Sequence, residues 1–281
     1  MRHRYECPMR WADLDQLRHV NNVVYVDYLQ EARVDMLRAH GRGPGALVEG
    51  LVVVRHEVTY VAPLTFGFRP VSIECWVTEI RAATFTMAYE LFQTDEHGDR
   101  TVHLRARTVL TPFVFAEERP RRITAEEREA LTQHLEPDEH PARRCVSPAE
   151  PVASTYDVHV RFSDVDVYGH VNNVKYFEYL QEARILFLHE LTDGERDFHL
   201  VVAQVDVDYR APILFREAPY ECRTSVADVG TKSMTLESDI RDGDRVLARA
   251  RAVLVFFDLD EQRSTEPPAA VRERLVALTT R

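Results

Sequence analysis

The sequence predicts an α+β protein built from two copies of one domain, in which a curved antiparallel sheet wraps around a long helix. Three observations predict this fold class. The chain has 281 residues, which is enough for two domains. Its two halves repeat the same residues in the same order. In each half, one apolar helical segment is followed by strand-like segments separated by turns, the pattern of a single sheet packed on a helix.

The internal repeat is the strongest feature of the sequence. Residues 10–22 align with residues 161–173, and the match continues without a gap well beyond them. A later segment, 60–63, aligns with 209–212 after a small change in spacing. Surface connections tolerate changes of length and paired strands do not, so this pattern is typical of a duplicated domain.

The long helix of each half is expected directly after the repeated segment. In the first half it covers residues 22–40, where apolar side chains recur at helical spacing, and it ends before Gly41-Arg42-Gly43, a typical C-terminal cap. One strand precedes the helix, and segments rich in β-branched and aromatic residues follow it. Short helices that begin near Thr124 and Pro267 close the two halves. The strands expected after the first long helix are 51–60, 71–80, 84–93 and 102–114.

The domain boundaries follow from a stretch rich in proline and charge between the repeats. We assign residues 1–135 to an N-terminal domain, 136–154 to a linker and 155–281 to a C-terminal domain. A domain of this size leaves a sheet edge and a face uncovered. We therefore expect the two copies to pair as an intramolecular pseudo-dimer, because fusion in one chain makes that pairing favourable.

Composition excludes several classes of partner. A formal net charge of −11 disfavours general binding to nucleic acid or anionic lipid. The sequence has no apolar run long enough to span a bilayer and does not begin with a secretory signal, so we expect a cytoplasmic protein without membrane attachment. The four cysteines are scattered, which indicates reduced thiols. The twelve histidines lack ligand spacing, so no metal site is expected.

A polar motif precedes the long helix in both halves. It reads Asp-x-x-x-His-Val-Asn-Asn-x-x-Tyr, from Asp15 to Tyr25 and again from Asp166 to Tyr176. The motif resembles the 4-hydroxybenzoyl-CoA thioesterase-like branch of the hotdog superfamily, and the resemblance covers both halves. It implies tandem hotdog domains with active sites at the interface of two hotdogs. The implied activity is that of an acyl-CoA thioesterase, which hydrolyses a fatty or aromatic acyl-CoA to the free acid and CoA. Coenzyme A is then part of the substrate and no separate cofactor is implied, and we expect a homo-oligomer.

The resemblance assigns catalysis to Asp166 and Asp15. A thioester carbonyl needs an attacking oxygen, supplied by the carboxylate itself or by a water that it deprotonates, and the sequence leaves both roles open. Backbone N–H groups at the start of the helix, 22–25 and 173–176, would stabilise the oxyanion, because unpaired donors and the positive end of the helix dipole coincide there. Oxyanion and substrate-binding roles are accordingly expected at His170, Asn172, Asn173, Tyr176, His19, Asn21, Asn22 and Tyr25.

Structural roles are possible for the same residues. The histidines and asparagines could cap the helix, and the tyrosines could be core aromatics that also line an acyl pocket. Asp13 and Asp164 are expected to bond the loop backbone. Glu31 and Glu182 are either buried acids near the site or partners of neighbouring arginines.

The two halves differ in the loop that follows the acid. Gly169 in the second half corresponds to Arg18 in the first, so the conformational freedom of glycine is lost there and a long cation enters the loop. We therefore expect Asp166 to be the working carboxylate before Asp15. Arg18 either meets a phosphate of the nucleotide or closes its site.

Two other functions compete with acyl-CoA hydrolysis. An acyl-carrier-protein thioesterase has a similar tandem arrangement, but that group has Asn two residues after the acid, where this chain has Leu17 or Tyr168. A non-catalytic acyl-CoA-binding module would keep the fold and lose turnover, and the Asp present in both copies disfavours it. A hotdog dehydratase is not supported, because the Gly-Asp-x-Asn-Pro segment is missing.

Overall fold

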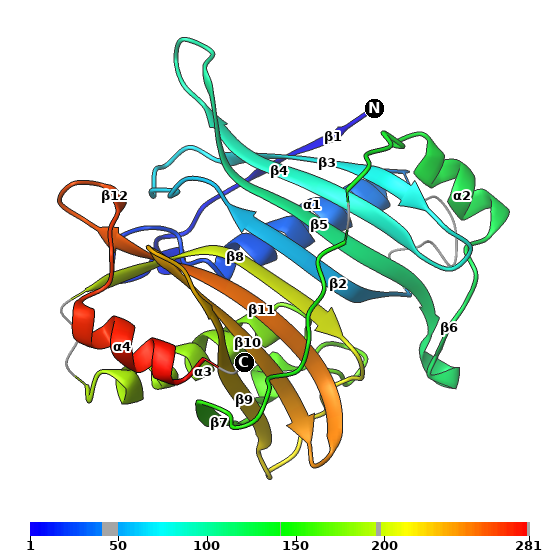
Figure 1. Cartoon of the computed structure of the whole chain (residues 1–281). Coiled ribbons are helices and arrows are strands. Elements are labelled where there is room, and N and C mark those ends of the chain that lie inside the picture. The colour runs from blue at the N-terminus through cyan, green and yellow to red at the C-terminus, as the bar shows by residue number, and fades with distance from the viewer. Residues whose placement is uncertain (41–49, 141, 195–197, 280–281) are drawn as a thin grey trace. The chain divides into compact units, whose positions relative to one another are not determined.

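The computed structural model describes residues 1–40, 50–140, 142–194 and 198–279 (Figure 1). It divides into two compact units, Met1–Ala142 and Arg143–Arg281. The helix cap expected at 41–43 lies outside the described residues. Within the described part of the chain, no helix is both long and apolar enough to cross a membrane.

The first unit consists of one antiparallel sheet, a long helix and a short helix. Its strands lie in the order β1-β3-β4-β5-β2, and the short β6 pairs with the end of β5. The elements are β1 (His3–Cys7), α1 (Val24–His40), β2 (Leu51–Tyr60), β3 (Val71–Ile80), β4 (Phe85–Thr94), β5 (Arg100–Val114), β6 (Arg119–Pro120) and α2 (Ala125–Thr132), with 3₁₀ turns at Trp11–Asp13 and Phe115–Glu117.

Helix α1 lies along one face of this sheet and packs on β1 and β3 (Figure 1). Its buried side chains, among them Leu29, Ala32 and Met36, recur on one side of the helix at helical spacing. The thiol of Cys75 in β3 lies 3.8 Å from the carbonyl oxygen of Ala32 and 3.6 Å from the sulfur of Met36. Each large apolar side chain buried in this way contributes about 1.5–3 kcal/mol, so the contact holds the helix on the sheet.

Most element bounds agree with the sequence prediction. Strands β2 and β3 have the predicted bounds, and β4 and β5 differ from theirs by one or two residues. Helix α2 starts after Thr124, as predicted. The Thr124 hydroxyl accepts a hydrogen bond from the Glu127 N–H at 3.2 Å, and the Glu127 carboxylate accepts one from the Thr124 N–H at 2.8 Å. This reciprocal capping satisfies two N–H groups that the first turn leaves unpaired.

The edge of β3 is covered by two different segments. β1 pairs with the first part of β3, as far as Cys75. Beyond it, the N–H of Val77 donates to the carbonyl of His134 at 3.0 Å, and the N–H of Glu136 donates to the carbonyl of Val77 at 2.8 Å. The chain that follows α2 therefore protects an edge that would otherwise present unpaired backbone groups.

The second unit repeats this architecture. Its strands lie in the order β7-β9-β10-β11-β8, with helix α3 packed on β7 and β9. Thr279 forms a parallel bridge to Val226, on the strand that corresponds to β3. The elements are β7 (Ser154–Val158), α3 (Lys175–Leu191), β8 (His199–Tyr209), β9 (Tyr220–Val229), β10 (Ser233–Asp242), β11 (Arg245–Asp258), β12 (Arg263–Ser264) and α4 (Ala269–Ala277), with a 3₁₀ turn at Phe162–Asp164.

The stretch interpreted as a linker is bonded to the unit on each side. On the first unit, Asp138 forms an ion pair with Arg107. On the second, Cys145 is buried, and Glu150 accepts a hydrogen bond from Arg223 at 2.6 Å. The proline-rich connection is thus held against each sheet by its own side chains.

Candidate active site

The carboxylate of Asp15 lies in a tight turn that its own backbone and side chain hold together. Its Oδ1 accepts hydrogen bonds from the N–H groups of Leu17 at 2.8 Å and His19 at 3.1 Å. The N–H of Asp15 donates to the carbonyl of His19 at 2.8 Å, and the N–H of Arg18 donates to the carbonyl of Asp15 at 3.1 Å. An Asp side chain that accepts from N–H groups further along the loop is the usual way to fix such a turn.

The second unit builds the same turn around Asp166. Its Oδ1 accepts from the N–H groups of Tyr168 at 2.9 Å and His170 at 3.2 Å. Its own N–H donates to the carbonyl of His170 at 2.7 Å. The duplicated motif therefore gives one geometry twice.

In each turn the backbone N–H groups bind only one of the two carboxylate oxygens, Oδ1. Neither Asp15 nor Asp166 has a hydrogen-bond partner for Oδ2 anywhere in the described residues, and both side chains are partly exposed. An oriented carboxylate with one unengaged oxygen is able to accept a proton from water or to attack a carbonyl carbon. The arrangement suits either of the two chemical roles that the sequence left open.

The acid two residues earlier is structural, as predicted. Asp13 is buried, and its Oδ2 accepts hydrogen bonds from the N–H of Arg10 at 2.7 Å and from the hydroxyl of Tyr28 at 2.5 Å. Burial raises the pKa of the Tyr28 phenol, and the bond to the Asp13 carboxylate raises it further. Asp13 therefore fastens the start of the loop to helix α1. In the second unit Asp164 accepts from the Arg161 N–H at 2.8 Å and the Tyr179 hydroxyl at 2.7 Å.

Asn21 organises the start of helix α1. Its side-chain oxygen accepts from the N–H of Val23 at 3.0 Å, and its carbonyl accepts from the N–H of Val24 at 2.9 Å. Two of the four N–H groups expected to stabilise an oxyanion are thus already bonded. The other two, those of Asn22 and Tyr25, have no acceptor among the described residues of the first unit. Capping therefore narrows the expected oxyanion donors to these two.

Asn172 plays the same part before helix α3. It accepts from the N–H of Val174 at 3.0 Å and, through its carbonyl, from the N–H of Lys175 at 2.9 Å. The N–H of Tyr176 has no acceptor in the described part of this unit. Asn21 and Asn172 therefore cap their helices, and direct contact of either side chain with substrate stays a prediction.

Tyr25 links the helix to the chain that follows β2. Its hydroxyl accepts a hydrogen bond from the N–H of Leu64 at 3.0 Å, and its ring packs edge-on against Tyr60 at a centroid distance of 5.5 Å. Burial raises the pKa of the Tyr25 phenol, and the nearby charge of Asp15 raises it further. The side chain is a core aromatic close to the acid. Tyr176 is placed in the same way, with its hydroxyl 3.0 Å from the N–H of Ile213.

His19 and His170 lie where the loop pairs with a neighbouring segment. His19 forms an isolated β-bridge with Thr65, and His170 forms one with Leu214. Both histidine side chains are half-buried. Their backbones thus hold the loop in place, while contact between their imidazoles and a substrate stays a prediction.

The structure adds one bracing residue in each unit that was not predicted, and it corrects one prediction. Tyr60 was not singled out, yet its hydroxyl donates to the carbonyl of Asn22 at 2.7 Å, and Tyr209 does the same to Asn173 at 2.9 Å. The repeated Tyr-x-Ala-Pro was the available signal. The hypothesis that Glu31 and Glu182 are buried acids is wrong, since both side chains are exposed.

Arg18 and Gly169 take the same unusual backbone conformation. Their φ angles are 60° and 82°, in the left-handed region, and the hydrogen bonds of the two turns correspond one to one. The loop around Asp15 therefore keeps the shape of its counterpart without glycine. A non-glycine residue in this region carries about 1–2 kcal/mol of strain.

We expect Arg18→Gly to stabilise the protein and Gly169→Arg to destabilise it. The relief of strain is partly offset by the greater freedom of glycine in the unfolded chain, so each change should be about 0.5–1 kcal/mol, with opposite signs. Urea unfolding of the two variants measures both. If Arg18→Gly lowers the free energy of unfolding, Arg18 makes a stabilising contact that outweighs its backbone strain.

His103 supports the segment that Tyr25 contacts, in the first unit only. It is 5% exposed, its Nδ1 lies 2.9 Å from the carbonyl oxygen of Pro63, and its Nε2 has no partner among the described residues. The carbonyl of His103 accepts hydrogen bonds from the N–H groups of residues 61 and 62. In the second unit Leu247 occupies the corresponding place, because its carbonyl accepts from the N–H groups of Arg210 and Ala211. Burial lowers the pKa of His103.

This lowered pKa predicts a pH-dependent stability. The folded chain disfavours the imidazolium, whereas the unfolded chain takes up the proton as the pH falls below about 6.5. The contribution of neutral His103 to the free energy of unfolding is therefore complete above that pH and is lost as the pH falls. We expect His103→Leu to gain stability relative to the wild type between pH 7.5 and pH 5, in denaturant melts at each pH. Parallel curves for the two proteins would contradict this assignment.

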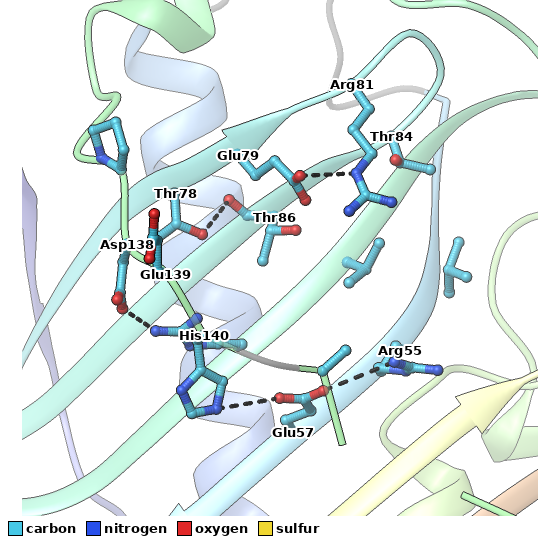
Figure 2. A pocket seen from close by; sticks show the side chains of 15 residues that line it. Arg55, Glu57, Thr78, Glu79, Arg81, Thr84, Thr86, Asp138, Glu139 and His140 are labelled. Atoms are coloured by element: carbon cyan, nitrogen blue, oxygen red, sulfur yellow. Dashed lines mark hydrogen bonds and ion pairs between the residues drawn. The ribbon is translucent and has the colours of Figure 1, made fainter. Parts of the chain in front are cut away.

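A separate cavity of about 830 Å³ opens on the face of the first sheet away from α1 (Figure 2). It contains none of the predicted site residues. Within the ranges that the structure describes, no group of three or more His, Cys, Asp or Glu side chains is placed to hold a metal ion. The arginines of the cavity all have acidic partners, in the pairs Arg55–Glu57, Arg81–Glu79 and Arg107–Asp138.

Comparison with known proteins gives curated relatives that each match part of this chain. The long-chain acyl-CoA thioesterase FadM of Escherichia coli (strain K12) is 27% identical over 127 residues, which cover 42% of this chain and 93% of FadM. The uncharacterized protein YsmA of Bacillus subtilis (strain 168) is 37% identical over 82 residues, or 28% of this chain. The match spans about half, 54%, of the length of YsmA.

Among solved structures, the 12:0-ACP thioesterase from Umbellularia californica matches both halves together. The TM-score is 0.74 at 17% identity, over 90% of this chain and 93% of that one, and at this identity the likeness shows the fold alone. The profile of the thioesterase-like superfamily matches residues 9–131 and 160–275. The chain therefore belongs to the thioesterase-like superfamily, a family of thioester hydrolases, with one hotdog domain in each half.

Proposed function

We propose that the chain hydrolyses a fatty or aromatic acyl-CoA to the free acid and CoA, with Asp15 and Asp166 as its catalytic carboxylates. One observation carries the proposal. In both units the carboxylate is oriented through Oδ1 by two backbone N–H groups, while Oδ2 has no partner in the described residues. The surface turn at Asp95 has the same hydrogen bonds, from the N–H groups of His97 and Asp99. Unlike that turn, the turns of Asp15 and Asp166 lead into the start of a long helix, where an N–H group without an acceptor in the described residues is available to stabilise an oxyanion.

The chemistry follows from these groups. Oδ2 attacks the thioester carbonyl carbon, or takes a proton from a water that attacks it, and the carbonyl oxygen becomes an oxyanion. The N–H groups of Asn22 and Tyr25, at the positive end of the dipole of α1, are the donors we propose for that oxyanion. Collapse of the tetrahedral intermediate breaks the C–S bond, and CoA leaves as a thiolate that takes up a proton. Where Oδ2 is the nucleophile, water then hydrolyses the acyl–aspartyl anhydride, which releases the free acid and restores the carboxylate. In the second unit we propose the N–H of Tyr176 for the same role.

The choice of a CoA thioester rests on the relatives and on one position of the motif. FadM is named as a long-chain acyl-CoA thioesterase. The Umbellularia protein is named for an acyl-carrier-protein substrate, but Leu17 and Tyr168 stand here where that group has Asn. We further propose that the protein acts in the cytoplasm. We also propose that it forms homo-oligomers, as the family resemblance implies.

The test is release of a free thiol, either CoA or the carrier protein's own, followed with a thiol reagent. Short, medium, long and aromatic acyl-CoAs are compared with the same acyl groups on acyl carrier protein. We expect release from at least one acyl-CoA, slowed at least about 100-fold in the Asp15→Asn/Asp166→Asn double variant. Hydrolysis of the acyl group only when it is carried on acyl carrier protein would favour an acyl-carrier-protein thioesterase. Binding of acyl-CoA without release would make the chain a binding module.

A further inference from the structure

Each unit exposes aromatic rings beside its catalytic turn. In the first unit Trp11 packs edge-on against Phe66 at 5.7 Å, and Phe66 packs against Phe68 at 5.3 Å. Trp11 is 75% exposed and Phe68 is 99% exposed. Large aromatic side chains at the surface cost free energy unless something covers them, so a cluster of three is informative.

The cluster adjoins the Asp15 turn through the backbone. Trp11 opens the 3₁₀ turn that ends at Asp13, and the loop continues directly to Asp15. On the other side, the bridge between His19 and Thr65 places the segment that carries Phe66 next to the loop. The rings therefore border the turn that holds the acid.

Two arginines lie in the chain segments that adjoin these rings. Arg18 lies in the catalytic turn, and Arg69 directly follows Phe68. Both side chains are exposed, and neither forms an ion pair with a residue in the described ranges. On a chain of net charge −11, two cations without acidic partners create a local field that the overall charge does not predict.

The second unit lacks this combination. It keeps the ring pair, Phe162 and Phe215 at 6.3 Å. Gly169 and Ala218 stand where the first unit has its two arginines, and Glu217 stands in place of Phe68. Arg216 is the nearby cation, and its guanidinium is held by Asp242 at 2.8 Å, by two carbonyls and over the ring of Tyr220. Among the described residues, the aromatic pair of the second unit therefore has no counterpart of Arg18 and Arg69.

We propose that the aromatic–arginine surface of the first unit, formed by Trp11, Phe66, Phe68, Arg18 and Arg69, binds the phosphorylated adenosine end of coenzyme A. This inference rests on the proposed function. A purine stacks on an exposed aromatic face for about 1–3 kcal/mol. Guanidinium groups bind phosphate oxygens through paired hydrogen bonds. An acyl chain would use the rings but not the cations, whereas a nucleotide uses both.

The proposal predicts a selective effect on KM. In the Asp166→Asn background, where turnover depends on the Asp15 turn that this surface borders, we expect two sets of changes to raise KM for an acyl-CoA about tenfold. These are Arg18→Gln/Arg69→Gln and, separately, Trp11→Ser/Phe68→Ser, and each corresponds to the loss of one stacking or phosphate contact. The comparison substrate is the N-acetylcysteamine thioester of the same acyl group, which has no nucleotide. KM for that substrate should rise much less. The matched control in the second unit, Phe162→Ser/Glu217→Gln, should leave KM for acyl-CoA within about twofold of wild type.

Several results would overturn the proposal. Equal rises for both substrates would show that the surface only supports the loop, and unchanged KM values would place the nucleotide elsewhere. A rise in KM only for the acyl group carried on acyl carrier protein would make this a protein-docking surface. If the wild type hydrolyses no thioester, the proposed function fails, but calorimetry with adenosine 3′,5′-bisphosphate still tests the surface. Binding that is lost in Arg18→Gln/Arg69→Gln then supports it, and no binding to the wild type overturns it.

Discussion

Replacing Asp15 and Asp166 by Asn together is expected to lower the rate of CoA release by at least about 100-fold, the usual contribution of a general base. Asn keeps an oxygen that accepts from the same two N–H groups, so the turn should survive while the charge and the proton-accepting oxygen are lost. The single variants then divide the activity between the units. We expect Asp166→Asn to remove the larger share, because Gly169 forms its turn without the strain that Arg18 carries.

The measurement is thiol release under saturating acyl-CoA, with circular dichroism and thermal unfolding as controls of folding. Equal losses in the two single variants would mean that both units work alike. If the double variant keeps more than about a tenth of the wild-type rate, neither carboxylate is the base, since a lost general base costs at least about 100-fold.

Replacing Asp13 by Ala is expected to cost about 3 kcal/mol of stability, because a hydrogen bond to a charged acceptor contributes about 1.5–3 kcal/mol. The change leaves the buried hydroxyl of Tyr28 and the N–H of Arg10 without their acceptor. Asp164→Ala is the matched change in the second unit, where Tyr179 and Arg161 lose the same bonds. Urea unfolding, with separate transitions for the two units if they appear, measures both.

A double-mutant cycle isolates the contact itself. Tyr28→Phe removes the hydroxyl from the other side, so in the Asp13→Ala background it should cost less than it does alone. Additive effects of the two changes would mean that the hydrogen bond contributes nothing. A cost below about 0.5 kcal/mol for Asp13→Ala, typical of a surface substitution, would show that this acid does not hold the loop.

Local rules were sufficient to predict much of the fold. The bounds of β2 and β3 could be predicted because strands of β-branched residues end at clear turn signals. The capping pair Thr124 and Glu127 predicts the start of α2 through hydrogen bonds made within a few residues. The duplicated motif placed Asp15 and Asp166 in equivalent turns, because a repeat reports structure that both copies share.

Features that depend on which groups the folded backbone engages could not be predicted. Asn21 uses two N–H groups of its own helix, so the donors left for an oxyanion are known only once that cap is seen. Glu31 is exposed because the helix turns its neighbour Ala32 toward the sheet. The loss of glycine at Arg18 suggested a changed loop, yet the bonds around Asp15 impose the left-handed conformation on whichever residue stands there.

The covering of β3 by the chain after α2 decides where the first unit can safely be cut. A fragment that stopped at the end of α2 would lose both bonds to Val77 and expose a bare strand edge, a template for joining other chains. A fragment that continued through Glu136 would retain them. Preparations of the isolated first unit should therefore differ in aggregation with only a few residues of added length, and a protease that cleaved directly after α2 would create a species prone to self-association.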